Sequence, residues 1–282
     1  MIALDNANLA LGWRDLLGLS AVGALVTTAG TLLGLVLKDW VFARSFEKWR
    51  TRHALEAAQR KYRDPIVLSA LELFHRLAEV LREYPTDFLA SHLLGEQETT
   101  TERSAIRDRY FRQYKLQSSV FRLCAFLGWL ELYRQELVFL ESGRGRPNRL
   151  VEDSIRNIRA DLADGTLNGS QDWYEWTDAL IYREEQRAIG EVMITDGSGA
   201  RVVLGYAQFS RLYKDDADGG TPWIATARRF FLDPEPPRDF RLERMRRLVA
   251  HLVDLVESLD PARISDDHRK VRAQYRNVTV AA

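Results

Sequence analysis

The sequence predicts a mainly α-helical protein, in which a single N-terminal transmembrane helix precedes a cytoplasmic helical bundle with a small β-hairpin. Three observations lead to this prediction. Residues 16–37 carry no charged side chain, which is typical of a membrane span. From residue 64 onwards, apolar residues mostly recur at helical spacing. Around residues 192–206, two short β-favouring runs flank a glycine-containing turn.

The first element is the predicted transmembrane helix, residues 16–37, which follows a short extracytoplasmic leader, residues 1–15. At about 1.5 Å per residue, this helix would reach roughly 33 Å, enough to cross a hydrocarbon core of about 30 Å. Trp13 and Trp40 flank it, where indole rings favour the membrane interfaces. A buried core helix and a signal peptide are the alternatives. Core helices seldom run so far without a charge, and the leader lacks a basic start and a clear cleavage site.

The same helix contains a row of small residues at alternating spacings of three and four: Ser20, Gly23, Thr27, Gly30 and Gly34. We call this row the small-residue seam. Small side chains let two helix backbones approach closely, and close packing drives helix association in lipid. We therefore expect the helix to self-associate and the protein to be a homo-oligomer. The alternative is that the glycines only reflect the usual composition of membrane helices.

Residues 38–63 form the second predicted element, a basic juxtamembrane helical stalk without glycine or proline. Eight Lys and Arg oppose three Asp and Glu in it. Because basic residues stay on the cytoplasmic side, this bias predicts a single-pass protein of the cell (inner) membrane, with its N-terminus outside and its body in the cytoplasm. The basic residues nearest the span would contact acidic lipid headgroups, or would only set the topology: Lys38, Arg44, Lys48, Arg50 and Arg52.

The body, residues 64–262, is predicted as one cytoplasmic helical domain, followed by a polar C-terminal tail, residues 263–282. Asp64 and Pro65 look like an N-cap and a first helical residue, and Pro85 ends that helix. Helical spacing predicts further helices over residues 86–95, 104–141, 150–162, 172–189, 222–232 and 240–259. The second half of 104–141 is apolar almost all round, so we expect it at the centre of the bundle.

One β-hairpin is predicted between these helices. Residues 192–195 and 201–206 are rich in β-favouring side chains, and the segment from Asp196 to Gly199 between them is typical of a hairpin turn. Gly190 is expected either to end the preceding helix or to lie within it.

The composition excludes several classes of function. Forty basic and forty acidic side chains cancel, so no overall field would attract nucleic acid, and no nucleic-acid partner is expected. Cys124 is the only cysteine, which excludes multi-cysteine zinc sites, and its apolar neighbours predict a buried, inert thiol. The sequence contains no nucleotide-binding glycine motif and no metal-binding histidine spacing, so we expect no cofactor and no metal.

The most unusual polar cluster is residues 184–191, which supplies the candidate catalytic residues Glu184, Glu185, Arg187 and Glu191. On a helix, Glu184, Arg187 and Glu191 share a face, while Glu185 points elsewhere. Carboxylates beside an arginine could serve acid–base chemistry in a cleft. The alternative is an ion-pair network on a solvated face or under the hairpin.

Three segments give the body a resemblance to an uncharacterised family of bacterial and fungal helical proteins that carries a G-E-Q-R-A-I-G-E block. They are residues 184–191, where Glu184 replaces the first glycine of the block, the segment Tyr62-Arg63-Asp64-Pro65, and residues 127–134. The resemblance implies that residues 62–259 form one unit. It implies no activity.

These observations predict a membrane-anchored interaction or effector module. Its expected partners are the lipid bilayer, further copies of the chain and an unidentified protein. A non-enzymatic role is favoured, because the body carries no catalytic motif. Two alternatives stay open: a membrane-tethered enzyme that uses the 184–191 cluster, and a pore-forming or membrane-disrupting effector whose hydroxyl-bearing span would line a multimeric lumen.

Overall fold

The chain divides into two compact units, Met1–His53 and Ala54–Ala282, in the computed structural model. The boundary between them falls inside the predicted stalk. The structure describes residues 24–31, 53, 56–57, 60–82, 89, 103–140, 149–165, 180–197, 199–217, 222–234 and 239–276.

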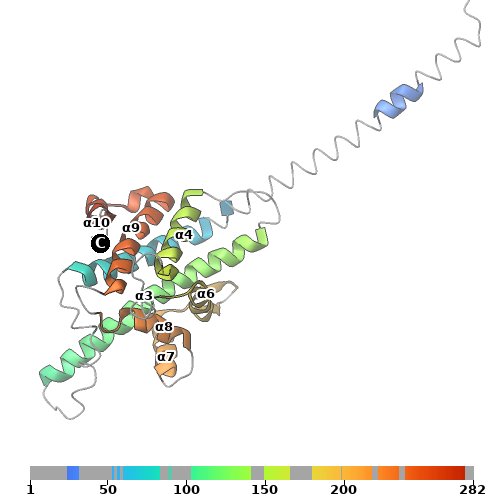
Figure 1. The fold of residues 1–282 in the computed structure, drawn as a ribbon. Helices are drawn as coiled ribbons and strands as arrows, with labels where there is room; N and C mark the ends of the chain where they lie inside the picture. Colours follow the sequence, from blue (N-terminus) through green and yellow to red (C-terminus); the bar gives the residue numbers. More distant parts are fainter. Residues whose placement is uncertain are drawn as a thin grey trace, which may run out of the picture. The chain divides into compact units, whose positions relative to one another are not determined.

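In the first unit, residues 24–31 form a helix (Figure 1). Its apolar side chains are exposed, among them Leu25 and Val26. Two threonine hydroxyls bond back to carbonyls of the same helix. Thr28 Oγ1 donates to the Ala24 carbonyl at 2.7 Å, and the Thr31 hydroxyl donates one turn back in the same way, at 2.5 Å. These hydroxyls therefore have a partner within the helix itself.

The remaining residues of the predicted span, 16–23 and 32–37, lie outside the described residues. The same holds for the stalk residues Lys38, Arg44, Lys48, Arg50 and Arg52. Within the part of the chain that the structure describes, no helix combines the length and the apolar character needed to cross a membrane.

The second unit is mainly α-helical and carries one two-stranded antiparallel sheet, which confirms the predicted helical bundle with a small hairpin. Residues 60–82 of this unit are helical. The elements that follow are α3 (Arg103–Leu140), α4 (Arg149–Ala163), α6 (Arg183–Val192), β1 (Ile194–Asp196), β2 (Arg201–Val203), α7 (Tyr206–Ala217), α8 (Pro222–Phe231), α9 (Phe240–Leu259), the 3₁₀ helix η3 (Pro261–Arg263) and α10 (Asp266–Arg276).

α3 runs through the centre of this unit, as predicted (Figure 1). It contacts α6, α7, α8 and β2, while α9 packs against both α4 and α10. Side chains in the second half of α3 are excluded from solvent, including Leu123, Phe126 and Leu130. The apolar side chains around this half of α3 therefore pack against neighbouring elements on several sides.

Helix 60–82 packs antiparallel along α3. Its early residue Tyr62 places its ring 6.3 Å from the ring of Tyr133, late in α3. Farther along, Arg76 Nη2 donates to Ser118 Oγ at 3.0 Å. Residues farther along helix 60–82 thus contact residues earlier in α3, which shows that the helices are antiparallel and fixes their register.

Pro65 lies within helix 60–82, so the predicted helix start at Asp64 is corrected. Proline has no backbone N–H and cannot donate to the carbonyl four residues earlier, which costs the helix one hydrogen bond. Burial offsets this loss, because Tyr62 and Ile66 beside the proline are 2 % and 1 % exposed.

α6 crosses α3 where neither helix has room for a larger residue. A Cβ atom added at Gly190 would lie 2.7 Å from Glu131 Cβ and 2.9 Å from the Leu127 carbonyl oxygen. A Cβ atom added at Gly128 would lie 3.0 Å from Met193 Cβ. Gly190 therefore lies inside α6 and permits the close approach of the two helices, rather than ending the helix.

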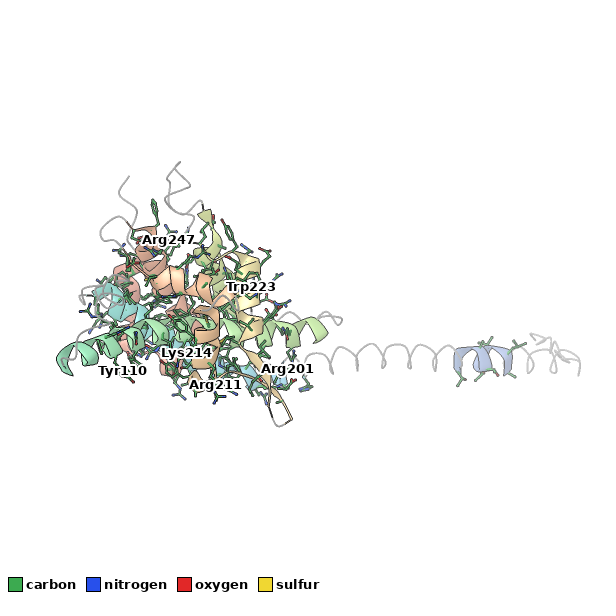
Figure 2. The ribbon with its side chains drawn as sticks, turned by 90° about the horizontal axis from the view of Figure 1, so that it is seen from below. Tyr110, Arg201, Arg211, Lys214, Trp223 and Arg247 are labelled. Carbon is green, nitrogen blue, oxygen red and sulfur yellow. The ribbon has the colours of Figure 1, made fainter. Side chains whose placement is uncertain are left out.

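The hairpin has the predicted turn but shorter strands. Ile194 pairs with Val203 and Asp196 with Arg201. Gly199 in the turn has φ 95°, a left-handed conformation that favours glycine. The hairpin also contacts α3 through a side chain, because Arg201 Nη1 donates to Gln135 Oε1 at 2.5 Å; Figure 2 labels Arg201 on its strand.

α7 begins at Tyr206, a residue that the β-favouring pattern placed in a strand. Gly205 N–H donates to Gln208 Oε1 at 3.3 Å at the start of this helix. Phe209, on its inner face, is fully buried, and its ring lies 5.3 Å from the ring of Phe121 in α3. Packing of this face therefore overrides the local β preference.

α10 occupies most of the predicted polar tail and packs on α9. Val271 and Tyr275, one turn apart, are buried. Arg272 Nη1 donates to Asp254 Oδ1 at 3.0 Å and to Glu257 Oε2 at 2.5 Å. Residues 266–276 therefore belong to the packed unit.

Candidate functional site

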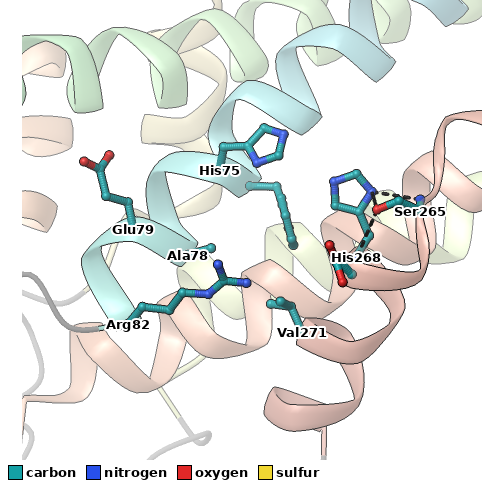
Figure 3. Close-up of a pocket in the computed structure, with 9 residues that line it drawn as sticks. His75, Ala78, Glu79, Arg82, Ser265, His268 and Val271 are labelled. Carbon is teal, nitrogen blue, oxygen red and sulfur yellow. Dashed lines mark hydrogen bonds between the residues drawn. The ribbon is translucent and has the colours of Figure 1, made fainter.

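A pocket of about 620 Å³ opens between helix 60–82 and the segment that begins α10 (Figure 3). Small-molecule sites in proteins occupy roughly 300–1,000 Å³, so the size suits a ligand rather than a single water. Helix 60–82 contributes five residues to its lining, and the α10 segment contributes four: Phe74, His75, Ala78, Glu79, Arg82, Ser265, Asp267, His268 and Val271.

Three rings meet in this pocket. The centroid of Phe74 lies 4.9 Å from that of His268 and 5.3 Å from that of His75, and the two imidazoles are 5.5 Å apart. Phe74, Ala78 and Val271 are buried and supply the apolar part of the lining. His75 is exposed and His268 half-buried, so both imidazoles can meet a ligand.

His268 also caps the first turn of α10 together with Ser265. Ser265 N–H donates to His268 Nδ1 at 3.1 Å, and His268 N–H donates to Ser265 Oγ at 3.3 Å. This is a capping box with histidine in the position that usually holds glutamate or glutamine. Because Nδ1 accepts, the neutral ring carries its proton on Nε2, on the side turned away from Ser265 (Figure 3).

Both imidazoles have lowered pKa values. Desolvation by burial is the main cause that lowers the pKa of His268, and the adjacent His75 lowers it further, whereas Asp267 raises it. Desolvation is also the main cause for the pKa of His75, followed by the positive charges of Arg122 and Arg82. The folded protein therefore favours two neutral rings.

The acidic groups of the pocket already have basic partners. Glu79 pairs with Lys115 and with Arg76, whose Nη1 lies 3.0 Å from Glu79 Oε2. Asp267 Oδ1 pairs with Lys270 Nζ at 3.3 Å. Arg82 is exposed and makes no hydrogen bond or ion pair within the described residues.

We expect the free energy of unfolding to fall as the pH drops below about 6.5, the ordinary pKa of histidine. Because the folded pKa values are lowered, the unfolded chain binds more protons in the window between the folded values and about 6.5, and acid favours unfolding there. The variant His268→Gln retains a capping side chain that does not titrate. Urea unfolding at about pH 7.5 and 5.5 should show a smaller loss for this variant than for the wild type. An equal loss would exclude His268 as a contributor.

The predicted catalytic residues do not line this pocket. Glu184, Arg187 and Glu191 are exposed on α6. Glu185 is used structurally: its Oε2 accepts the Tyr182 N–H at 2.8 Å. The structure thus places three of the four on the solvent side of one helix and the fourth at its N-terminal cap.

The neighbouring Gln186 holds α6 to α4. Its Nε2 donates to the carbonyl of Arg159 at 3.1 Å and to that of Ile181 at 2.8 Å. Beside Gly190 of α6, Glu131 of α3 is 1 % exposed and accepts two hydrogen bonds from Arg134, at 2.8 and 2.5 Å. Gln186 and Gly190 of the 184–191 region therefore belong to a packed junction of α3, α4 and α6.

A second buried network joins α4 and α9. Arg244 is fully buried and donates to the Asp161 carbonyl at 2.6 Å and to the Asp164 carbonyl at 2.9 Å. His251 Nδ1 lies 2.5 Å from Asp161 Oδ2. Desolvation by burial lowers the pKa of Arg244 to about 10, against the effect of the two aspartates, so the guanidinium stays charged at pH 7.

This network completes the hydrogen bonds at the C-terminal end of α4. The last carbonyls of a helix have no partner within it. Here the carbonyls of Arg159, Asp161 and Leu162 receive the Gln186 side chain, Arg244 and the Ile181 N–H. The pairing is structural, and it accounts for a charged residue in the middle of the bundle.

Other candidates are placed as follows. Cys124 is buried, as predicted. Of the small-residue seam, Thr27 and Gly30 lie in helix 24–31, and Ser20, Gly23 and Gly34 lie outside the described residues. Among the described residues, no group of three or more His, Cys, Asp or Glu is arranged to hold a metal ion.

The pocket could not be predicted from sequence spacing, because His75 and His268 lie far apart in the sequence. One local signal was available. Ser265-x-x-His268 has the spacing of a capping box, which indicates a helix start within the supposed tail.

Comparison with known proteins gave no match: no family model, no curated protein and no solved structure is similar to this chain.

Proposed function

We propose that this protein is a single-pass, membrane-anchored interaction module of the cell (inner) membrane. Residues 16–37 anchor and assemble it, and the second unit acts in the cytoplasm on a partner. The observation that carries the proposal is the uncharged run of residues 16–37 followed directly by the basic stretch 38–63. Eight leucines and three valines in the run each favour insertion by roughly 0.3–0.6 kcal/mol.

The local geometry of helix 24–31 supports this proposal. Polar groups without a partner are costly in hydrocarbon. The hydroxyls of Thr28 and Thr31 donate to carbonyls of their own helix, which reduces that cost. Leu25 and Val26 are exposed, as side chains facing lipid would be.

Gly30 supports the self-association part of the proposal. A Cβ atom added there would meet nothing within 4 Å, so the seam has an open surface at this position. A second helix can approach such a surface closely.

The enzyme alternative receives no support from the described geometry. Glu185 is engaged with the Tyr182 N–H, and the other three predicted catalytic residues are exposed. A cleft that gathers these four side chains would be needed for acid–base chemistry. The favoured role is therefore non-enzymatic.

The first test of the proposal compares the masses of two proteins in mild detergent: the full-length chain and a chain shortened to begin at Trp40. We expect the full-length chain to form oligomers and the shortened chain to be monomeric. Equal assembly of both would move the interface into the second unit and leave residues 16–37 with an anchoring role only.

Replacing Gly23, Gly30 and Gly34 together by leucine is expected to reduce oligomerisation of the full-length protein. Leucine would hold the two helix backbones apart and remove the close packing. The control is Ala29→Leu, which adds a leucine on the opposite face of the helix and should leave the oligomer unchanged. If the triple variant forms oligomers as the wild type does, the small-residue seam does not mediate self-association.

A further inference from the structure

The pocket between helix 60–82 and α10 contains one arginine and two carboxylates. Both carboxylates have basic partners outside the lining: Glu79 pairs with Arg76 and Lys115, and Asp267 pairs with Lys270. Arg82 lines the pocket without such a partner in the described part of the chain. In Figure 3 its guanidinium extends from helix 60–82 towards the α10 wall.

The field at the imidazoles indicates which charge the pocket accepts. Arg122 and Arg82 both act on His75 against its protonated form. The same two charges would repel a metal cation that approached this ring, although neutral imidazoles are good ligands for metals. They would attract an anion, so the charges around His75 favour an anion over a metal cation.

The pocket offers directed donors for an anion from both walls. On the α10 wall, Ser265 N–H donates a hydrogen bond to His268 Nδ1. The proton of the neutral ring therefore lies on Nε2, which faces away from Ser265. On the helix 60–82 wall, Arg82 carries a planar guanidinium, whose fork matches carboxylate and phosphate oxygens.

Part of the lining is apolar, and the pocket is too large for an inorganic ion alone. Phe74, Ala78 and Val271 are 3 %, 5 % and 5 % exposed. Together with the volume of about 620 Å³, they leave space for a hydrocarbon or aromatic body beside the charged group.

We propose that this pocket binds a small organic anion, with its carboxylate or phosphate group held by Arg82 and His268 and its apolar body against Phe74 and Val271. This binding role is separate from anchoring and self-association, and it holds whether or not residues 16–37 assemble the protein. The acid group could belong to a soluble metabolite or to a lipid headgroup.

The test uses the full-length protein in nanodiscs of phosphatidylcholine, with isotope-labelled histidine followed by NMR. The chain has five histidines, and the variants His75→Gln and His268→Gln assign the two signals that matter. Three probes distinguish the contribution of the charged group from that of the apolar body. Phenyl phosphate carries both, inorganic phosphate lacks the apolar body, and benzyl alcohol lacks the charge.

Phenyl phosphate is expected to shift the His75 and His268 signals saturably and to bind at least about 10-fold more tightly than either partial probe. It should also raise the pKa of both imidazoles, because a bound anion favours their protonated form. Arg82→Gln should weaken binding at least about 10-fold, and Arg82→Lys, which keeps the charge but not the fork, should weaken it less. The control Arg211→Gln, an exposed arginine on α7, should bind as the wild type does (Figure 2).

Three outcomes would overturn the proposal: no saturable shift at either histidine, equal binding of benzyl alcohol and phenyl phosphate, or equal binding by Arg82→Gln and the wild type. Circular dichroism checks that Arg82→Gln is folded, and Arg82→Lys serves in its place if it is not. Nanodiscs containing phosphatidic acid identify the source. Shifts without added probe assign the site to a lipid headgroup, and shifts with phenyl phosphate alone assign it to a soluble anion.

Discussion

Replacing Arg244 by methionine is expected to lower the free energy of unfolding by about 3–5 kcal/mol, the usual cost of removing one partner from a buried charged network. Two carbonyls at the end of α4 would lose their donor, and a buried group without a partner costs about 1–3 kcal/mol. Asp161, which is also buried, would lose its nearby positive charge. Urea unfolding of the full-length protein in mild detergent measures the loss.

The matched control for this prediction is Arg246→Met, two residues farther along α9. Arg246 makes one hydrogen bond, to Glu243 at 3.5 Å, and its side chain is 31 % exposed. Such pairs contribute less than about 1 kcal/mol. If the two variants lose similar amounts of unfolding free energy, Arg244 does not stabilise the C-terminal end of α4.

Replacing Gly190 by valine is expected to lower the free energy of unfolding by about 2–4 kcal/mol, at the upper end of overpacking effects. Its Cβ alone would lie 2.7 Å from Glu131 Cβ and 2.9 Å from the Leu127 carbonyl oxygen, and backbone cannot move aside cheaply. α6 would have to separate from α3, which would also disturb the hairpin contact at Gly128. Thermal or urea unfolding of the variant tests this directly.

Gly205→Val provides the comparison for Gly190. An added Cβ at Gly205 meets nothing within 4 Å, so the substitution should cost only the poorer helix cap, less than about 1 kcal/mol. If both glycines tolerate valine equally, the crossing of α3 and α6 has more freedom than the distances indicate.

Much of the second unit could be predicted because its helices are long and their apolar residues recur regularly. α3, α4, α8 and α9 lie within a few residues of their predicted bounds. Where the prediction failed, tertiary packing had decided the local structure. Tyr206 follows a β-favouring run but begins α7, because Phe209 packs into the core. α10 was harder to recognise, because it buries only Val271 and Tyr275.

The candidate site depended on contacts that sequence spacing does not reveal. The residues of the 184–191 segment stood out as a possible catalytic cluster, yet three of them have structural reasons to be there. Glu185 caps α6, Gln186 binds the end of α4, and Gly190 permits the crossing with α3. An unusual polar sequence is therefore also what a tight junction of three helices requires.

The pocket that contains His75 and His268 is built from two segments that are synthesised at different times. One wall comes from helix 60–82 and the other from the segment that begins α10, so a nascent chain can complete the pocket only after residue 271 has been made. A product that ends before residue 265 would lack Ser265, Asp267, His268 and Val271. Ligand binding at this pocket would thus distinguish chains that extend past residue 271 from shorter ones.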